Sequence, residues 1–122
     1  MQNDWGAGEK PVRREFRVPV DDKDGVRLIV GGREYEIRNL VPNGVQVVYE
    51  VENEFETNME LDGAELIVGE RKIEVRAKVV YTSRLEPGRF SCGLYFLTIN
   101  NEDVQFLRKL VAQKRKLLFS DV

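Results

Sequence analysis

The segment RKIEVRAKVVY, residues 71–81, carries the clearest structural pattern in the sequence. Apolar residues alternate with charged ones along most of it, which is the period of a β-strand that buries one face. The side chains predicted to point into the core are those of Ile73, Val75, Ala77, Val79 and Tyr81. A strand needs partners for its backbone hydrogen bonds, so the rest of the chain should contain further strands.

Shorter β-rich segments flank this strand and are separated by turn residues. They cover residues 26–30, 33–38, 45–51, 64–68 and 89–97. Gly31 and Gly32 predict a tight hairpin turn between the first two, because glycine adopts the positive φ angles that such a turn needs. In the third segment, alternate side chains from Val45 to Val51 are predicted to share the buried face. Residues 52–62 are acidic and lack a clear pattern, so we expect a loop or an irregular strand there.

The last segment changes to a helical period. Asn100 or Asn101 is suited to cap a helix, and an apolar stripe at helical spacing follows, made of Val104, Leu107, Val111 and Leu118. Six strands at hairpin spacing followed by one helix predict a mainly β fold, a six-stranded antiparallel β-barrel with a C-terminal α-helix. Closing the sheet into a barrel also removes exposed strand edges.

Length and composition limit the classes of function. The 122 residues are enough for one domain, and a net charge of −2 argues against wrapping nucleic acid. Histidine is absent and Cys92 is the only cysteine. Histidine-dependent triads, histidine-bound zinc and intrachain disulfides are therefore excluded. We expect a binding module without cofactor or metal, not an enzyme.

The sequence shows no targeting or membrane-spanning segment. No apolar run approaches the roughly 20 residues of a membrane helix, and the N-terminus does not resemble a signal peptide. A single cysteine fits a reducing compartment. We expect a cytoplasmic protein that does not insert into membranes, with residues 1–12 as a flexible arm and residues 13–122 as a single domain.

Three arginines lie close together just before the first expected strand: Arg13, Arg14 and Arg17, in the run RREFRVPV. A guanidinium keeps its charge, binds phosphate oxygens through two N–H groups and stacks on aromatic bases. A short arm that carries several of them is suited to close over an anionic ligand that contains a base. Solvated charges without a ligand are the alternative interpretation of the cluster taken alone.

A second candidate segment runs from Asn39 to Gly44, with the sequence NLVPNG. The Asn39 side chain both donates and accepts hydrogen bonds, which suits it to read the edge of a base. Gly44 allows another group to approach the backbone closely. A plain β-turn is the alternative interpretation, since proline, asparagine and glycine all favour turns.

Together the two segments resemble the PilZ domain family. Residues 13–20 are similar to its RxxxR arm, and residues 39–44, about twenty positions further on, match two of the three defining positions of its D/N-x-S-x-x-G motif. Residues 93–96, GLYF, followed by a final helix, resemble the end of the domain. The resemblance covers nearly everything from Val12 onward and implies the split barrel of that family.

The resemblance also implies binding of cyclic di-GMP, the bacterial second messenger, as a ligand. Arg13 and Arg17 would then bind the phosphates and stack on guanine, Arg14 would assist, and Asn39 with the turn that follows it would contact a guanine edge. The serine of the motif is Val41 here, which has no hydroxyl. A missing hydrogen bond costs about 0.5–1.5 kcal/mol, so we expect binding that is retained but weakened by up to about tenfold.

We expect such a receptor to order its arginine arm on the ligand and to signal, in motility or biofilm regulation, to a downstream protein that the sequence does not identify. We expect a monomer or weak dimer. The main alternative is a divergent PilZ domain that binds no nucleotide and acts as a protein-interaction adaptor, which Val41 suggests. A barrel that binds single-stranded nucleic acid through Arg13, Arg17 and Tyr49 is a second alternative, which the net charge disfavours.

Overall fold

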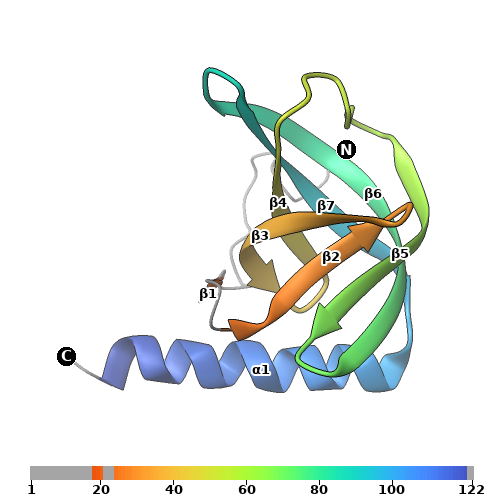
Figure 1. The fold of residues 1–122 in the computed structure, drawn as a ribbon. Helices are drawn as coiled ribbons and strands as arrows, with labels where there is room; N and C mark the ends of the chain where they lie inside the picture. The colour runs from red at the N-terminus through yellow and green to blue at the C-terminus, as the bar shows by residue number, and fades with distance from the viewer. Residues whose placement is uncertain (1–17, 21–23, 121–122) are drawn as a thin grey trace.

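The computed structural model describes residues 18–20 and 24–120, in which antiparallel strands curve into a barrel and one long helix lies beneath it (Figure 1). The strands are β1 (Val18–Pro19), β2 (Val26–Val30), β3 (Arg33–Val41), β4 (Gly44–Tyr49), β5 (Glu60–Val68), β6 (Arg71–Glu86) and β7 (Arg89–Ile99). The helix is α1 (Asn101–Ser120). The predicted mainly β fold with a C-terminal helix is confirmed.

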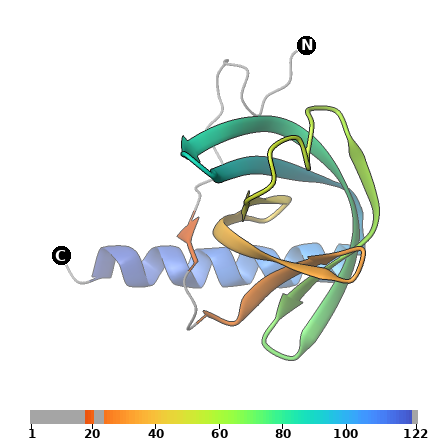
Figure 2. The same cartoon turned by 45° about the horizontal axis from the view of Figure 1, so that its top comes forward.

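Six of the strands close the barrel. β2 pairs with β3 and β5, β6 lies between β5 and β7, and β4 pairs with both β7 and β3, so the sheet returns to its start. Every pairing is antiparallel. The short β1 lies outside this ring and pairs with β3. Figure 2 shows the strands curving around in front of α1. The six-stranded antiparallel barrel is therefore confirmed, with one extra strand.

Alternation along the strands fills the barrel with apolar side chains. Val75, Ala77 and Val79 of β6 are buried in the core, as predicted, together with Leu66 of β5 and Leu94 of β7. Burying one large aliphatic side chain contributes about 1.5–3 kcal/mol, so this shared core is the main force that closes the sheet. The predicted hairpin turn also forms, with φ angles of 59° at Gly31 and 80° at Gly32.

Two residues predicted to face the core do not. A β-bulge between Val79 and Tyr81 shifts the register of β6 against β7, so Tyr81 lies on the outer face, opposite Gly93. β4 ends at Tyr49, and Val51 lies in the following loop with 57% of its surface exposed. In both cases the alternating pattern of the sequence continues past the point where the regular strand geometry changes.

The loop between β4 and β5 packs an aromatic side chain into the barrel. Phe55 is buried, with ring centres 5.2 Å from Tyr35 and 5.0 Å from Tyr49 in edge-to-face arrangements. The neighbouring Glu54 accepts a hydrogen bond from the Tyr35 hydroxyl and forms an ion pair with Arg33 at 3.0 Å. Burial, together with the contact to Glu54, raises the pKa of Tyr35. This loop is shorter than predicted, because β5 already begins at residue 60.

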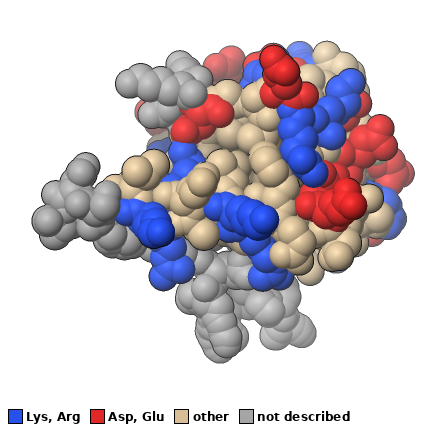
Figure 3. All heavy atoms as spheres, turned by 90° about the horizontal axis from the view of Figure 1, so that it is seen from below, with Lys and Arg blue, Asp and Glu red and all other residues tan. Residues whose placement is uncertain are grey.

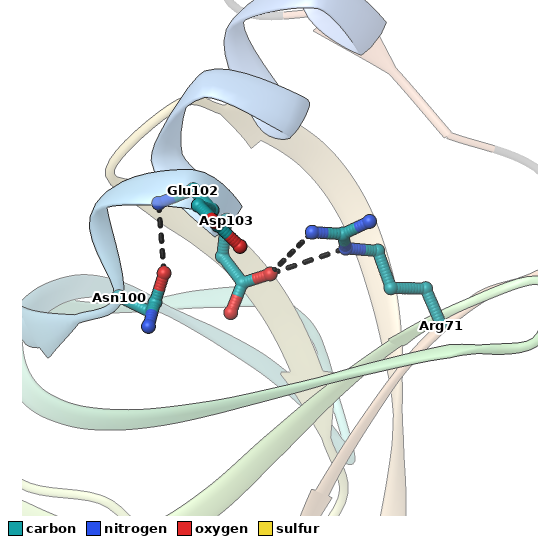
Figure 4. Close-up of polar contacts among 4 residues, drawn as sticks. All are labelled: Arg71, Asn100, Glu102 and Asp103. Atoms are coloured by element: carbon teal, nitrogen blue, oxygen red, sulfur yellow. Dashed lines mark hydrogen bonds and ion pairs between the residues drawn. The ribbon is translucent and has the colours of Figure 1, made fainter.

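The start of α1 is fixed to β6 by polar contacts (Figure 4). The Asn100 side chain caps the helix, accepting a hydrogen bond of 2.7 Å from the N–H of Glu102. Arg71, the first residue of β6, donates through Nε and Nη2 to Oδ1 of Asp103 at 3.1 and 2.8 Å. Its guanidinium also lies 4.3 Å from the centre of the Phe106 ring. These contacts set where the helix starts and how it crosses the barrel.

The helix turns an apolar face to the barrel and a basic face to solvent. Leu107 and Val111 are buried, and the half-buried Lys114 forms an ion pair with Asp24, just before β2. Lys and Arg side chains gather on the side seen in Figure 3; the exposed ones on α1 are Arg108, Lys109, Arg115 and Lys116. Leu118 continues the predicted stripe but is 45% exposed, because the helix extends past the barrel (Figure 1).

Candidate functional site

The predicted arginine arm leads directly into β1. The predicted site residues that lie outside the described part of the chain are Arg13, Arg14 and Arg17. The next residue, Val18, is fully buried and pairs with Leu40 of β3, and Pro19 pairs with Asn39. β1 therefore fixes the point where the arm joins the barrel, and this point lies beside Asn39.

The second predicted segment forms the hairpin between β3 and β4. Asn39 and Val41 belong to the end of β3, Pro42 and Asn43 form the turn, and Gly44 begins β4, where it pairs with Val41. The carbonyl oxygen of Asn43 accepts a backbone hydrogen bond of 2.8 Å from β7. Pro42 and Asn43 thus form a turn, while Asn39 and Val41 lie on a strand in the barrel wall.

Asn39 faces the outside of the barrel, in line with residues from three further strands. Its neighbour Leu40 is part of the core, so alternation places Asn39 on the opposite face. The pairing registers place Asn39 opposite Gln46 of β4, Gln46 opposite Gly93 of β7, and Gly93 opposite Tyr81 of β6. We call these four residues the outer row: Asn39, Gln46, Gly93 and Tyr81.

Polar contacts within the outer row continue to a buried hydroxyl. Asn39 donates through Nδ2 to Oε1 of Gln46, and Gln46 donates through Nε2 to Oγ of Ser91 at 3.3 Å. Within residues 18–20 and 24–118, Ser91 is the only buried polar residue, and it has no exposed surface. Buried hydroxyls are almost always hydrogen-bonded, and the contact with Gln46 satisfies Ser91.

A shallow hollow lies over the outer row. Its volume is about 210 Å³ including its open mouth, and its lining includes Asn39, Val41, Gly44 and Tyr81. The Tyr81 ring lies against Gly93 so closely that a Cβ atom at position 93 would be 2.2 Å from Cε2 of the ring. Glycine is therefore needed at position 93 for the ring to form this wall. An aromatic wall beside hydrogen-bonding amides is suited to hold a nucleobase.

The hollow brings together three predicted residues and several that the sequence reasoning missed. Asn39, Val41 and Gly44 were predicted and all line it. Gln46 was missed, although a polar residue among the valines of β4 is a signal for an outward position with a polar partner. Tyr81 was missed because the sequence pattern assigned it to the core.

The described residues offer neither a reactive thiol nor a site for a metal ion. Cys92 is buried in the core, and burial raises its pKa to about 12, so its thiol stays protonated. Within the described ranges, no three His, Cys, Asp or Glu side chains gather where a metal ion would be held. None of the helical segments that the structure describes is long and apolar enough to cross a membrane.

The family model described as PilZ domain matches residues 11–113. No curated protein is significantly similar to the sequence.

Solved structures of the same fold come from several bacteria. The PilZ domain of Escherichia coli YcgR, solved with c-di-GMP, is 14% identical with a TM-score of 0.67, over 87% of this chain and 93% of that one. The Bacillus subtilis inhibitor of motility MotI/DgrA is 19% identical with a TM-score of 0.70, over 98% of this chain and 58% of that one. K. pneumonia MrkH in its apo state is 12% identical with a TM-score of 0.74, over 88% of this chain and 51% of that one. At these identities the likeness shows the fold alone, and this chain spans little more than half of MotI and MrkH.

Proposed function

The chain belongs to the PilZ domain family, and on that premise we propose that it is a receptor for cyclic di-GMP. The dinucleotide binds on the outer face of the barrel beside Asn39, the arginine arm becomes ordered over it, and the changed surface is read by a protein partner. The domain itself catalyses no reaction. The observation that carries this proposal is the register of β1, whose first residue, Val18, pairs with Leu40, so that the arm joins the barrel next to Asn39.

The arginine arm and the outer row together match the phosphates and the bases of the ligand. Cyclic di-GMP carries two phosphodiester charges and two purine bases. Arg13 and Arg17 bind the phosphates and stack on guanine, and Arg14 assists, because a guanidinium combines a fixed charge with a flat face. Asn39 contacts a base edge at one end of the outer row, and Tyr81 provides an aromatic surface at the other.

The size of the hollow explains why the arm is needed. Ligand pockets usually enclose about 300–1,000 Å³, whereas the enclosed part of this hollow has only about 10 Å³. A dinucleotide on this face would therefore remain largely exposed to water. A second layer of protein is required to cover it, and the arm is attached at the edge of the same face.

Val41 lowers the affinity of this site for cyclic di-GMP but does not abolish binding. The residue is 5% exposed and lines the hollow, so an apolar side chain takes the place where the family motif has serine. The ligand loses one hydrogen bond, which lowers the affinity by a factor of several up to about ten.

The proposal is tested by isothermal titration of the whole chain with cyclic di-GMP, with GTP as the control ligand. We expect saturable binding at micromolar concentration or below, and its loss in Arg13→Ala and in Arg17→Ala. Arg108→Ala is the matched control, because Arg108 is an exposed arginine on α1. Equal affinity in all three variants would refute the assignment of the site, and no heat of binding in the wild type would refute the receptor function.

The second candidate function is a protein-interaction adaptor that binds no nucleotide. It is favoured by one observation, the buried Val41 in place of a hydroxyl. Hydrogen exchange of residues 12–17 separates the two functions. A receptor becomes protected there when cyclic di-GMP is added, whereas an adaptor shows the same exchange with and without the nucleotide.

A further inference from the structure

A further row of side chains runs beside the outer row on the same face of the barrel. The pairing registers place Val41 opposite Gly44 of β4, Gly44 opposite Tyr95 of β7, and Tyr95 opposite Lys78 of β6. We call these four residues the second row. On β3, β4 and β7 it lies two residues from the outer row, about 7 Å along the strands. Val41 and Gly44 line the hollow, so the second row continues the surface on which we place the ligand.

Tyr95 and Lys78 point away from the barrel core. Tyr95 lies between the core residues Leu94 and Phe96, and both sequence neighbours of Lys78 also belong to the core, so alternation turns the two side chains outward. Tyr95 is 37% exposed, and Lys78 is half-buried. Between Tyr95 and the far end of the second row lies Gly44, which has no side chain. No side chain of this row therefore separates the Tyr95 ring from the hollow.

The ammonium group of Lys78 is not neutralised by an acidic neighbour. On the side away from Tyr95, Lys78 pairs with Glu60 of β5, but the Glu60 carboxylate forms an ion pair with Arg76. Within residues 18–20 and 24–118, no acidic side chain forms an ion pair with Lys78. A lysine ammonium binds phosphate as a compact point charge. Lys78 is therefore available to an anion on the outer face.

Tyr95 is also the diagonal neighbour of Tyr81 across β6 and β7. Tyr81 pairs with Gly93, and Tyr95 lies two residues further along β7. Diagonal neighbours in an antiparallel pair lie about 7–8 Å apart, within reach of aromatic side chains. The face thus offers two aromatic side chains at this spacing, with a lysine opposite the second. A ligand with two bases joined by phosphodiester groups has the matching components.

We propose that Tyr95 and Lys78 extend the binding site beyond the hollow, with the Tyr95 ring stacking on one guanine of cyclic di-GMP and the Lys78 ammonium pairing with a phosphodiester group. This inference rests on the proposed function. The enclosed part of the hollow is only about 10 Å³, so most of the dinucleotide lies outside it and needs further contacts with the barrel. The second row supplies these contacts, and the arginine arm covers the ligand from the other side.

The test is isothermal titration of the whole chain with cyclic di-GMP. Tyr95→Leu removes the ring but keeps an apolar side chain, and Lys78→Met removes the charge at similar length. We expect each to lower the affinity at least about fivefold. The matched controls are Leu97→Ala, on the same strand as Tyr95 and almost equally exposed (38%), and Lys72→Met, about 20 Å from Lys78 along β6. Both controls should bind within about twofold of the wild type.

Salt separates a direct charge contact from a general loss of folding. The Debye length falls from about 10 Å at 0.1 M salt to about 3 Å at 1 M. The effect of Lys78→Met relative to the wild type should therefore shrink to less than about twofold at 1 M, whereas the effect of Tyr95→Leu should persist. A variant that only destabilised the barrel would lose affinity by the same factor at both concentrations, and this result for Lys78→Met would refute the phosphate contact.

The outcomes separate the inference from the function on which it rests. If the wild type binds cyclic di-GMP and Arg13→Ala does not, but Tyr95→Leu and Lys78→Met bind like the wild type, the inference is refuted and the receptor function stands. If the wild type binds no cyclic di-GMP, both are refuted. Tyr95→Phe keeps the ring without the hydroxyl and should bind more tightly than Tyr95→Leu, so equal affinities of these two variants would refute the stacking.

Discussion

Replacement of Gly93 by alanine should destabilise the protein through one contact, that with the Tyr81 ring. A Cβ atom at position 93 would lie 2.2 Å from Cε2 and 2.8 Å from both Cδ2 and Cζ of Tyr81. Carbon atoms pack at about 3.5–4.0 Å, so the ring has to move by more than about 1 Å. Because Tyr81 is half-buried at the surface, we expect the ring to swing outward and the strands to stay in place.

The cost follows from two opposing effects. Overpacking of a well-packed site costs about 1–3 kcal/mol, and a ring that escapes toward solvent belongs at the low end of that range. Alanine in a strand is favoured over glycine by about 0.5–1 kcal/mol, because glycine loses more backbone freedom on folding. We therefore expect Gly93→Ala to lower the free energy of unfolding by up to about 1.5 kcal/mol.

The assay is urea unfolding of four proteins: the wild type, Gly93→Ala, Tyr81→Ala and the double variant. When the ring is absent, the new methyl group meets none of the three ring atoms, and only the gain in backbone entropy remains. In the Tyr81→Ala background, Gly93→Ala should then be neutral or should stabilise the protein by up to about 1 kcal/mol. The reasoning would be refuted if Gly93→Ala cost the same in both backgrounds, since the loss would then come from the strand and not from the ring.

Three further predictions concern the hollow, the core thiol and the β4–β5 loop. Val41→Ser should lower the free energy of unfolding by about 1 kcal/mol, because it removes buried apolar surface, yet it should raise the affinity for cyclic di-GMP several-fold in the titration; an unchanged affinity would argue against the motif assignment. Burial raises the pKa of Cys92 to about 12 from an ordinary value of 9.0, so its contribution to stability is complete below pH 9 and is lost as the pH rises toward 12. Urea unfolding between pH 8 and about pH 10.5 should therefore show a smaller loss of stability in Cys92→Ala than in the wild type, and parallel curves would contradict this. Phe55→Ala should lower the free energy of unfolding by about 3 kcal/mol, because the ring is 4% exposed and packs on Tyr35 and Tyr49; a loss below about 1 kcal/mol would show that the loop contributes little to the core.

The fold could be predicted from the sequence because the patterns that indicate it each span only a few neighbouring residues. Alternation over residues 71–79, the Gly31-Gly32 turn and the Asn100 cap each act within a few residues, and each is found in the structure. The ends of the strands are decided by pairing with distant partners. β5 begins at residue 60 and not at residue 64, because Glu60 and Leu61 pair with β6 across a bulge that the acidic sequence does not reveal.

The candidate site was only partly predictable because it is assembled across strands. Asn39, Val41 and Gly44 lie within six residues of one another, so a motif reveals them. The contact between Gln46 and Ser91 joins residues 45 positions apart in the sequence, and it exists only because β4 pairs with β7 in one register. A polar residue in a valine-rich strand indicates an outward position, but it does not identify the partner.

One irregularity accounts both for the wrong assignment of Tyr81 and for the aromatic wall of the site. A shift of one residue in a strand turns every following side chain to the other face. The bulge between Val79 and Tyr81 produces this shift at the point where β6 passes Gly93. Without the bulge, the alternation that buries Val79 would also bury Tyr81, and the outer row would have no aromatic residue at its end. Strict alternation in the sequence predicts the barrel because the barrel is regular, and the same assumption hides the place where the barrel departs from regularity to form a site.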